Sequence, residues 1–260
     1  MKQLFAIISS FYNYLLQEEY VTMNPVSLIR QKSKFIRKIQ EKPKIRRLSE
    51  LQWLYVIEKA QELANTESNS YNERTLFVMS ALYLMYLRIS ELVERARWTP
   101  KMNDFARDSD NNWWFTTVGK GNKQRQIAVS DTMLEALKRW RRHLKLSPLP
   151  TAADIMPLIP KITGVGAITS TTYVRKIVQK CFDQAIEDLH KDGFDDEAES
   201  LLTATVHWLR HTGISEDIKT RPKEHVRDDA GHSSSAITDK YIDIELRERH
   251  RTAKKKLLIQ

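Results

Sequence analysis

Apolar residues recur every three to four positions over much of the chain, a pattern typical of amphipathic helices. The first such segment is 3–18, and the second is 48–63. Ser49, followed three residues later by Gln52, fits a capping box at the start of the second segment. Residues 74–87 are apolar around most of the helix and therefore predict a buried helix.

The period changes between 113 and 129, where two β-prone runs flank a Gly-Lys-Gly-Asn turn and predict a β-hairpin. Helical patterning returns at 131–145, with Asp131 as the expected N-cap, and the prolines of 146–160 predict a loop. Further helices are expected at about 171–190, 196–202, 206–219, 223–229 and 244–258. The predicted fold class is mainly α with a small antiparallel β-sheet (α+β).

The composition narrows the functional class. Seven glycines in 260 residues argue against a Gly-rich nucleotide-binding fold. The lone cysteine, Cys181, excludes a disulfide framework and a Cys-rich metal site, and its neighbours favour a packed residue over a reactive thiol. We find no signal peptide and no apolar run of about 18 residues, so the sequence predicts a cytoplasmic protein with no membrane partner.

The net charge of +9 is unevenly distributed. Residues 1–47 carry +7 of it, mostly between 30 and 47. We interpret 30–47 as a basic linker between a small helical segment, 1–29, and a main domain, 48–260. A dense basic strip indicates a nucleic acid partner, and a solvated linker is the alternative. The DNA contacts expected in the strip are Lys32, Lys34, Arg37, Lys38, Lys44 and Arg46.

Four short stretches carry residues suited to phosphate chemistry. They are YLRISEL with Arg88, VGKGNKQRQIAV with Lys120, HWLRHT with His207 and Arg210, and AGHSSSAITDKYI with His232 and Tyr241. Two guanidiniums can bind the non-bridging oxygens of a phosphodiester through charge-assisted hydrogen bonds. Surrounding cations also lower the cost of forming a phenolate, which makes a tyrosine a feasible nucleophile.

Simpler interpretations exist for the first two of these residues. Arg88 could pair with Glu91 or Glu94 at the end of an apolar helix. Lys120 could be a solvated turn residue, and Lys123 competes with it for any role at the hairpin tip. The composition of each stretch alone does not decide between these possibilities.

The helix predicted through 205–215 places His207, Arg210 and His211 on one face. The two histidines have the spacing of half a zinc site. However, an arginine lies between them and no third ligand follows at a typical spacing. We therefore predict no metal site and interpret His211 as structural.

In this order and with this spacing, the four stretches resemble the tyrosine recombinases of the phage integrase family. The resemblance covers about residues 48–255, the family's catalytic domain, and 1–29 resembles part of its helical core-binding (SAM-like) domain. It implies a site-specific recombinase or integrase that cleaves and rejoins DNA through a 3′-phosphotyrosine intermediate, without metal, ATP or another cofactor. The implied catalytic residues are Arg88, Lys120, His207, Arg210, His232 and the nucleophile Tyr241.

The resemblance also implies a role for each side chain. The two arginines and His232 would bind the phosphate. His207 would take or hold the tyrosine's proton, and Lys120 at the hairpin tip would protonate the leaving 5′-oxygen. The hairpin cations Lys123 and Arg125 are added to the expected DNA contacts.

The implied partners are double-stranded DNA, a homotetramer on synapsed DNA, and accessory DNA-bending or directionality factors, in a bacterial, nucleoid-associated setting. Two positions depart from the family pattern: Tyr86 stands where glycine is frequent, and Ala230 replaces a common leucine. A catalytically silent DNA-binding fragment and a type IB topoisomerase-like strand transferase are the alternative functions.

Overall fold

The computed structural model describes residues 2–18, 20–26, 29, 46–232, 235–238 and 241. The chain divides into two compact units, Met1–Lys44 and Ile45–Gln260. Most of the predicted linker and the whole of the predicted helix 244–258 lie outside the described residues. Within the described part of the chain, no helix has the length and apolar character needed to cross a membrane.

The first unit is built around helix α1, Lys2–Gln17, which confirms the helix predicted from the apolar stripe. The chain after α1 folds back onto it through Asn24. The Asn24 side chain donates to the Ser9 carbonyl oxygen at 3.0 Å and to the Asn13 side-chain oxygen at 2.7 Å. These bonds satisfy a buried amide and fix the turn against the helix.

Helix α4 is the centre of the second unit. Its neighbours α3, α5, α6 and α8 all pack against it. Every residue of α4 from Asn72 to Leu82 is buried, as expected for a helix surrounded by other elements. Up to Asp217, the α-helices of this unit are α3 (Glu50–Thr66), α4 (Ser70–Leu84), α5 (Asp131–His143), α6 (Thr171–Lys191), α7 (Asp195–Leu201) and α8 (Val206–Asp217).

The helix starts follow local capping chemistry. The capping box predicted at α3 is present: Ser49 Oγ accepts from the Gln52 N–H at 3.1 Å, and the Gln52 side-chain oxygen accepts from the Ser49 N–H at 3.0 Å. The N-cap predicted for α5 was wrong by one residue. Ser130 caps this helix by accepting from the Met133 N–H, and Asp131 is the first helical residue.

A three-stranded antiparallel sheet contains the predicted hairpin. Its strands are β1 (Phe105–Arg107), β2 (Trp113–Val118) and β3 (Gln124–Ala128), in that order. Phe115 of β2 pairs with Phe105 and Ile127, and all three are buried, so they form the inner face of the sheet. Strand β1 was not predicted, because three residues are too short for a periodic pattern.

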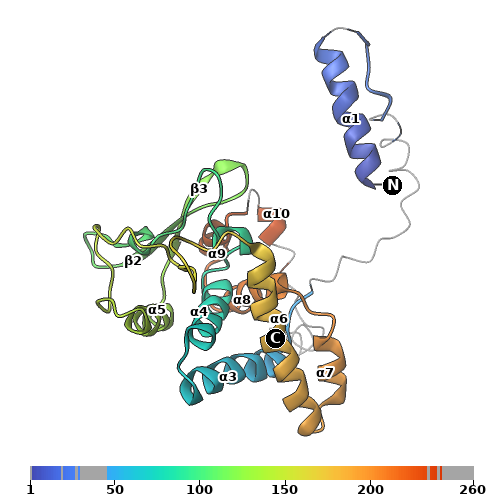
Figure 1. The fold of residues 1–260 in the computed structure, drawn as a ribbon. Helices are drawn as coiled ribbons and strands as arrows, with labels where there is room; N and C mark the ends of the chain where they lie inside the picture. The colour runs from blue at the N-terminus through green and yellow to red at the C-terminus, as the bar shows by residue number, and fades with distance from the viewer. Residues whose placement is uncertain are drawn as a thin grey trace, which may run out of the picture. The chain divides into compact units, whose positions relative to one another are not determined.

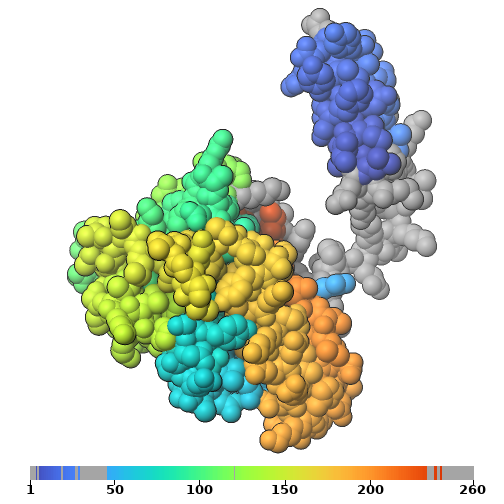
Figure 2. Space-filling model, viewed as in Figure 1, coloured from blue at the N-terminus to red at the C-terminus, as the bar shows by residue number. Residues whose placement is uncertain are grey.

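The sheet and α5 occupy one side of the second unit, and α6 and α7 the other (Figure 1). In the space-filling view the green and yellow-green residues of the sheet side meet the yellow and orange residues of α6 and α7 (Figure 2). Two short helices complete the described chain, α9 (Lys223–Ala230) and α10 (Ser235–Thr238), and α9 packs against β3.

The buried helix predicted over 74–87 ends at Leu84. Two residues later Tyr86 has φ 51°, in the left-handed region that non-glycine residues rarely adopt. The chain then enters a short 3₁₀ helix, η1 (Ile89–Glu91). Arg88 consequently lies on extended backbone at the start of η1, four residues beyond the end of α4.

Candidate active site

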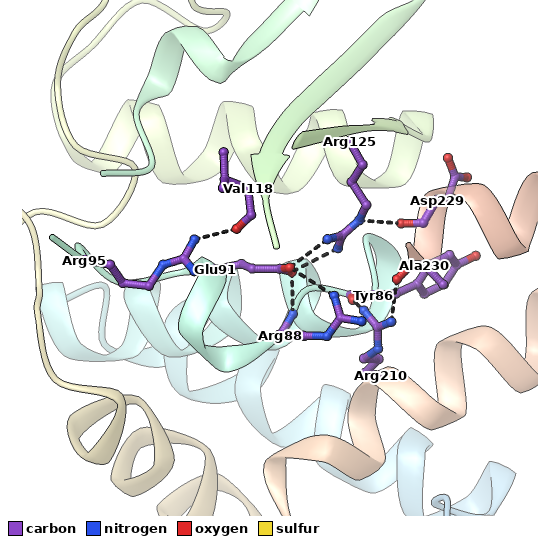
Figure 3. A network of polar contacts seen from close by, with 9 residues as sticks. All are labelled: Tyr86, Arg88, Glu91, Arg95, Val118, Arg125, Arg210, Asp229 and Ala230. Carbon is purple, nitrogen blue, oxygen red and sulfur yellow. Dashed lines mark hydrogen bonds and ion pairs between the residues drawn. The ribbon is translucent and has the colours of Figure 1, made fainter. Parts of the chain in front are cut away.

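Arg210 is almost completely buried at the point where α8 meets the end of α4. Its guanidinium donates to the Tyr86 carbonyl oxygen and, at 2.6 Å, to the Ala230 carbonyl oxygen (Figure 3). Burial lowers the pKa of Arg210, and the nearby charges of Arg88 and Arg125 lower it further. The side chain still remains cationic at neutral pH, since a guanidinium loses its proton only at strongly alkaline pH. The fold therefore holds a fixed positive charge at this position.

A second cluster lies beside Arg210 and consists of Arg88, Glu91 and Arg125, which we call the Glu91 cluster. Arg125 binds the fully buried Glu91 carboxylate through both terminal nitrogens, at 2.6 and 2.9 Å. Arg88 approaches the same carboxylate with its backbone N–H at 2.8 Å and its guanidinium at 3.2 Å. Figure 3 shows the two arginines converging on Glu91 from different elements.

Charge pairing sets the protonation state of the Glu91 cluster. Burial by itself would raise the pKa of Glu91. The hydrogen bonds and charge of Arg125, with the backbone bond and charge of Arg88, outweigh burial and lower the pKa below its usual value. Glu91 is thus a carboxylate at neutral pH. The predicted alternative partner of Arg88 is present, yet the Arg88 side chain remains 29% exposed and can reach a ligand.

The structure places Arg125 in a different role from the DNA contact expected of it. Its side chain is only 10% exposed. Besides the two bonds to Glu91, its Nε donates to the Asp229 carbonyl oxygen at 3.0 Å. These three bonds join strand β3 to η1 and to α9, so Arg125 holds the site together from inside.

The end of β2, just before the hairpin tip, lies against the Glu91 cluster. Gly119, just before the tip, is so close that an added Cβ would lie 3.2 Å from both a Glu91 oxygen and an Arg125 nitrogen. Arg95 also donates to the Val118 carbonyl oxygen at the end of β2. Both strands of the hairpin are therefore fastened by arginines at the base of the turn that carries Lys120.

The structure describes only some of the basic residues that were expected to act on DNA. The backbone of Lys120 belongs to the short 3₁₀ helix η3 (Lys120–Asn122), and its side chain lies outside the described part of the structure. Lys123 and Arg46 are exposed. The other basic-strip residues expected to contact DNA lie outside the described residues: Lys32, Lys34, Arg37, Lys38 and Lys44.

His232 follows directly after the C-cap of α9, where the chain turns sharply. Gly231 caps this helix with φ 63°, a left-handed conformation suited to glycine, and an added Cβ would lie 2.7 Å from Arg125 Cδ. The chain can therefore turn back toward α8 immediately after the helix. His232 Nδ1 then lies 3.0 Å from Thr238 Oγ1 on α10, which leaves its Nε2 for another partner.

The Tyr241 ring lies between two histidines. His211 Nδ1 is 2.6 Å from the Tyr241 hydroxyl, and the His232 ring stacks on Tyr241 with centroids 5.6 Å apart. His207 continues the row, with its ring centroid 5.7 Å from that of His211. Burial raises the pKa of Tyr241, whereas the charges of Arg210 and Arg88 lower it. A phenol surrounded by imidazoles and guanidiniums is the arrangement needed to form and use a tyrosinate.

Tyr86 shows how the fold accommodates a large side chain where the family often has glycine. The ring is buried, and its hydroxyl bonds to the Asp217 carboxylate and accepts from Arg221 at 3.1 Å. Burial, together with the bond to Asp217, raises the pKa of Tyr86 well above its usual value. The phenol thus stays protonated and ties the end of α4 to the end of α8, while its carbonyl oxygen binds Arg210.

A cleft of about 550 Å³ opens beside His207, between α6 and the start of α8. Its lining includes the cationic residues Arg175 and Lys176. Burial lowers the pKa of His207, and the charges of Arg210, Arg88 and Arg175 add to this effect. In the part of the chain that the structure describes, no group of three or more His, Cys, Asp or Glu residues is arranged to hold a metal ion.

Sequence reasoning brought together five of the residues found here. The structure places Arg88, His207, Arg210, His232 and Tyr241 in one electrostatically coupled site. Glu91 was expected only as an alternative partner of Arg88, Arg125 only as a DNA contact, and His211 only as a structural residue. A signal for His211 existed, because it shares a helix face with His207 and Arg210, but its contact with Tyr241 depends on tertiary structure.

The free energy of unfolding is expected to fall as the pH drops from about 6.5 to about 4. Burial and neighbouring positive charges lower the pKa of both His211 and His232 to about 4. In that pH window the unfolded chain binds more protons than the folded protein, so acid favours unfolding. We expect a loss on the order of 1–2 kcal/mol per histidine, because solvent reaches part of each ring.

Urea denaturation between about pH 7 and pH 4.5 measures this pH dependence. The double variant His211→Asn/His232→Asn serves as the control, and its stability should depend less on pH in that window. The same dependence in the variant and the unsubstituted protein would contradict the assignment to these two rings.

Known proteins resemble this chain over most of its length. A family model described as the phage integrase family matches residues 52–247. Tyrosine recombinase XerD of Staphylococcus saprophyticus is 26% identical over 239 residues, which are 91% of this chain and 69% of the relative. Tyrosine recombinase XerC of Caldanaerobacter subterraneus subsp. tengcongensis is 25% identical over 245 residues, which are 92% of this chain and 58% of the relative.

Solved structures share the fold at lower identity. The XerH site-specific recombinase bound to difH substrate has a TM-score of 0.55 and 19% identity, covering 84% of this chain and 55% of that chain. XerA recombinase has a TM-score of 0.55 and 18% identity, and the match covers 97% of this chain and 83% of that chain. Because the family model spans well over half of its residues, this chain belongs to the phage integrase family, and its second unit carries a tyrosine recombinase catalytic domain.

Proposed function

We propose that this chain acts as a site-specific DNA recombinase that cleaves and rejoins strands through a 3′-phosphotyrosine intermediate. One observation carries the proposal: the Tyr241 hydroxyl is bonded to a histidine and lies in the field of both Arg88 and Arg210. A tyrosine packed only for stability does not need this set of neighbours. Double-stranded DNA is the proposed substrate.

The two arginines would bind the scissile phosphate. A guanidinium has five N–H donors, and Arg210 uses two of them on the Tyr86 and Ala230 carbonyls. The donors that remain on Arg210 and Arg88 can bind the non-bridging oxygens, where negative charge grows during attack. Preorganised donors of this kind contribute about 3–4 kcal/mol each to transition-state stabilisation.

The chemical step is a transesterification. The Tyr241 oxygen attacks phosphorus and forms the phosphotyrosine bond, while the bond from phosphorus to the 5′-oxygen breaks. The phenolic proton passes to one of the histidines beside Tyr241, and Lys120 supplies a proton to the leaving 5′-oxygen. His232, whose Nδ1 is engaged by Thr238, would donate from Nε2 to the phosphate. The reverse reaction rejoins the strand without an external energy source.

Positive charge on the second unit supports DNA as the substrate. Arg175 and Lys176 line the cleft beside His207, and Lys123 and Arg46 are exposed. Contacts of such residues with phosphates release counterions, so we expect binding to weaken steeply with salt. The family resemblance supports two further parts of the proposal. The chain would assemble into a homotetramer on synapsed DNA, and it would use accessory DNA-bending or directionality factors.

Covalent trapping tests the proposed function. The protein is incubated, with EDTA present, with nicked duplexes from its own genomic surroundings, and products are separated on denaturing gels. We expect a covalent protein–DNA band that Tyr241→Phe abolishes, because only the hydroxyl can attack phosphorus. A mobility shift on native gels without any covalent band would instead indicate a binding-only protein. Relaxation of supercoiled DNA without a preferred site would indicate a topoisomerase-like activity.

A further inference from the structure

Among the described residues, His211 makes a direct hydrogen bond with the Tyr241 hydroxyl. Its Nδ1 lies 2.6 Å from the phenolic oxygen, and the two ring centroids are 5.5 Å apart. Both side chains are largely enclosed, and Tyr241 is only 6% exposed. His207, four residues earlier on α8, approaches the His211 ring. No bond from His207 to Tyr241 is among the contacts of the described residues.

The direction of this hydrogen bond follows from the charges around it. Burial, His207 and Arg210 all disfavour a protonated His211, and they lower its pKa to about 4. The ring is therefore neutral at neutral pH, and one of its nitrogens can accept. Tyr241 keeps its proton, since burial raises its pKa. The phenol consequently donates and His211 Nδ1 accepts, which places the His211 proton on Nε2.

We propose that His211 positions the nucleophile by holding the Tyr241 hydroxyl with Nδ1 in the orientation from which it attacks the phosphate. This inference rests on the proposed strand-transfer function and assigns a role to a residue outside the implied catalytic set. A phenol attached to the chain by rotatable bonds samples many directions. A fixed acceptor at its oxygen, with His232 stacked on its ring, restricts that motion before DNA arrives.

The pKa of His211 is lowered and that of Tyr241 is raised, so the hydrogen bond between them holds the phenol in place without removing its proton in the resting state. A neutral ring with a depressed pKa is a weak proton acceptor beside a phenol whose pKa is raised. The bond therefore keeps the nucleophile protonated and in place. A phosphate that binds between Arg88 and Arg210 would then add negative charge beside the Tyr241 hydroxyl.

Three His211 variants test the positioning role. Asparagine places a side-chain oxygen close to where Nδ1 lies, whereas leucine fills the space without an acceptor. We expect His211→Leu to slow single-turnover cleavage of a nicked duplex by about 10–100-fold, with DNA affinity changed less than about twofold. His211→Asn should restore the rate to within about threefold of the unsubstituted protein. His211→Gln, whose acceptor lies further along the side chain, should restore it less well.

The rate comparison distinguishes positioning from packing. A purely structural role predicts equal losses in the leucine and asparagine variants, or a loss that follows their thermal stabilities, and either result would overturn the proposal. Faster cleavage by His211→Leu would also overturn it, because His211 would then restrain the nucleophile. The asparagine variant keeps the comparison valid if the leucine variant folds poorly.

A second measurement reports the contact independently of cleavage. In ¹⁵N spectra of histidine-labelled protein, the His211 Nδ1 resonance is identified by its absence from His211→Asn. It should move toward the position of a free ring nitrogen in Tyr241→Phe, which lacks the donor. An unchanged resonance would refute the contact. If the unsubstituted protein cleaves no DNA while the resonance moves, the proposed function fails and the Tyr241–His211 bond stands.

Discussion

Replacing Glu91 with alanine is expected to lower the free energy of unfolding by about 3–5 kcal/mol. The Glu91 carboxylate is fully buried and is bound by both terminal nitrogens of Arg125 and by Arg88. Its removal leaves the Arg125 guanidinium, with a side chain only 10% exposed, without a countercharge. Removing one partner of a buried ion pair costs more than the pair itself contributes, because an uncompensated charge remains in the interior.

Urea denaturation at neutral pH measures the effect of Glu91→Ala. Glu94→Ala is the matched control, because Glu94 is three residues away and exposed, and its replacement should change stability by no more than about 0.5 kcal/mol. Glu91→Gln keeps the shape but removes the charge, and it should fall between the two. Similar stabilities for Glu91→Ala and Glu94→Ala would show that the cluster contributes little to folding.

Replacing Arg210 with lysine is expected to slow covalent cleavage of DNA by at least about 10²–10³-fold. An ammonium is a compact charge without the planar fork that lets Arg210 bind the Tyr86 and Ala230 carbonyls and still present donors to a phosphate. Burial beside Arg88 and Arg125 also lowers the pKa of an amine placed there, so the variant loses the planar fork and part of its positive charge. Loss of rate would therefore report both the geometry of the donors and the fixed charge that the guanidinium supplies.

Single-turnover cleavage of a nicked duplex measures the Arg210→Lys effect, with DNA affinity determined in parallel. Arg142→Lys on α5 is the control, since Arg142 is exposed and the same change there should leave the rate within about twofold. Circular dichroism at the assay temperature establishes that both variants are folded. An Arg210→Lys rate within tenfold of the unsubstituted protein would remove Arg210 from the phosphate-binding role.

Elements with a strong periodic pattern were predictable from the sequence. The buried run in α4, the capping box at Ser49 and the hairpin of β2 and β3 all follow from local residue order. The limits of that approach are visible at the end of α4. Local pattern extended the helix to 87, whereas the helix ends at Leu84 and the Tyr86 carbonyl oxygen accepts from Arg210, 124 residues away.

The difference between local residue order and long-range contacts also explains which parts of the site were predicted. Residue type and order indicated Arg88, His207, Arg210, His232 and Tyr241, because these carry the chemistry themselves. Arg125 was expected to contact DNA from the hairpin. Only the folded chain brings it to Glu91 and to the Asp229 carbonyl oxygen, 104 residues away.

These long separations have a consequence for synthesis of the protein. A nascent chain that ends before α8 contains Arg88 and the hairpin but lacks Arg210, His211 and Tyr241. Contacts between residues so far apart form only after long stretches of chain have been ordered, and they come late in folding. The capacity to break DNA would therefore arise only in a chain whose catalytic domain is fully made and folded. Incomplete products of translation would leave the genome uncut.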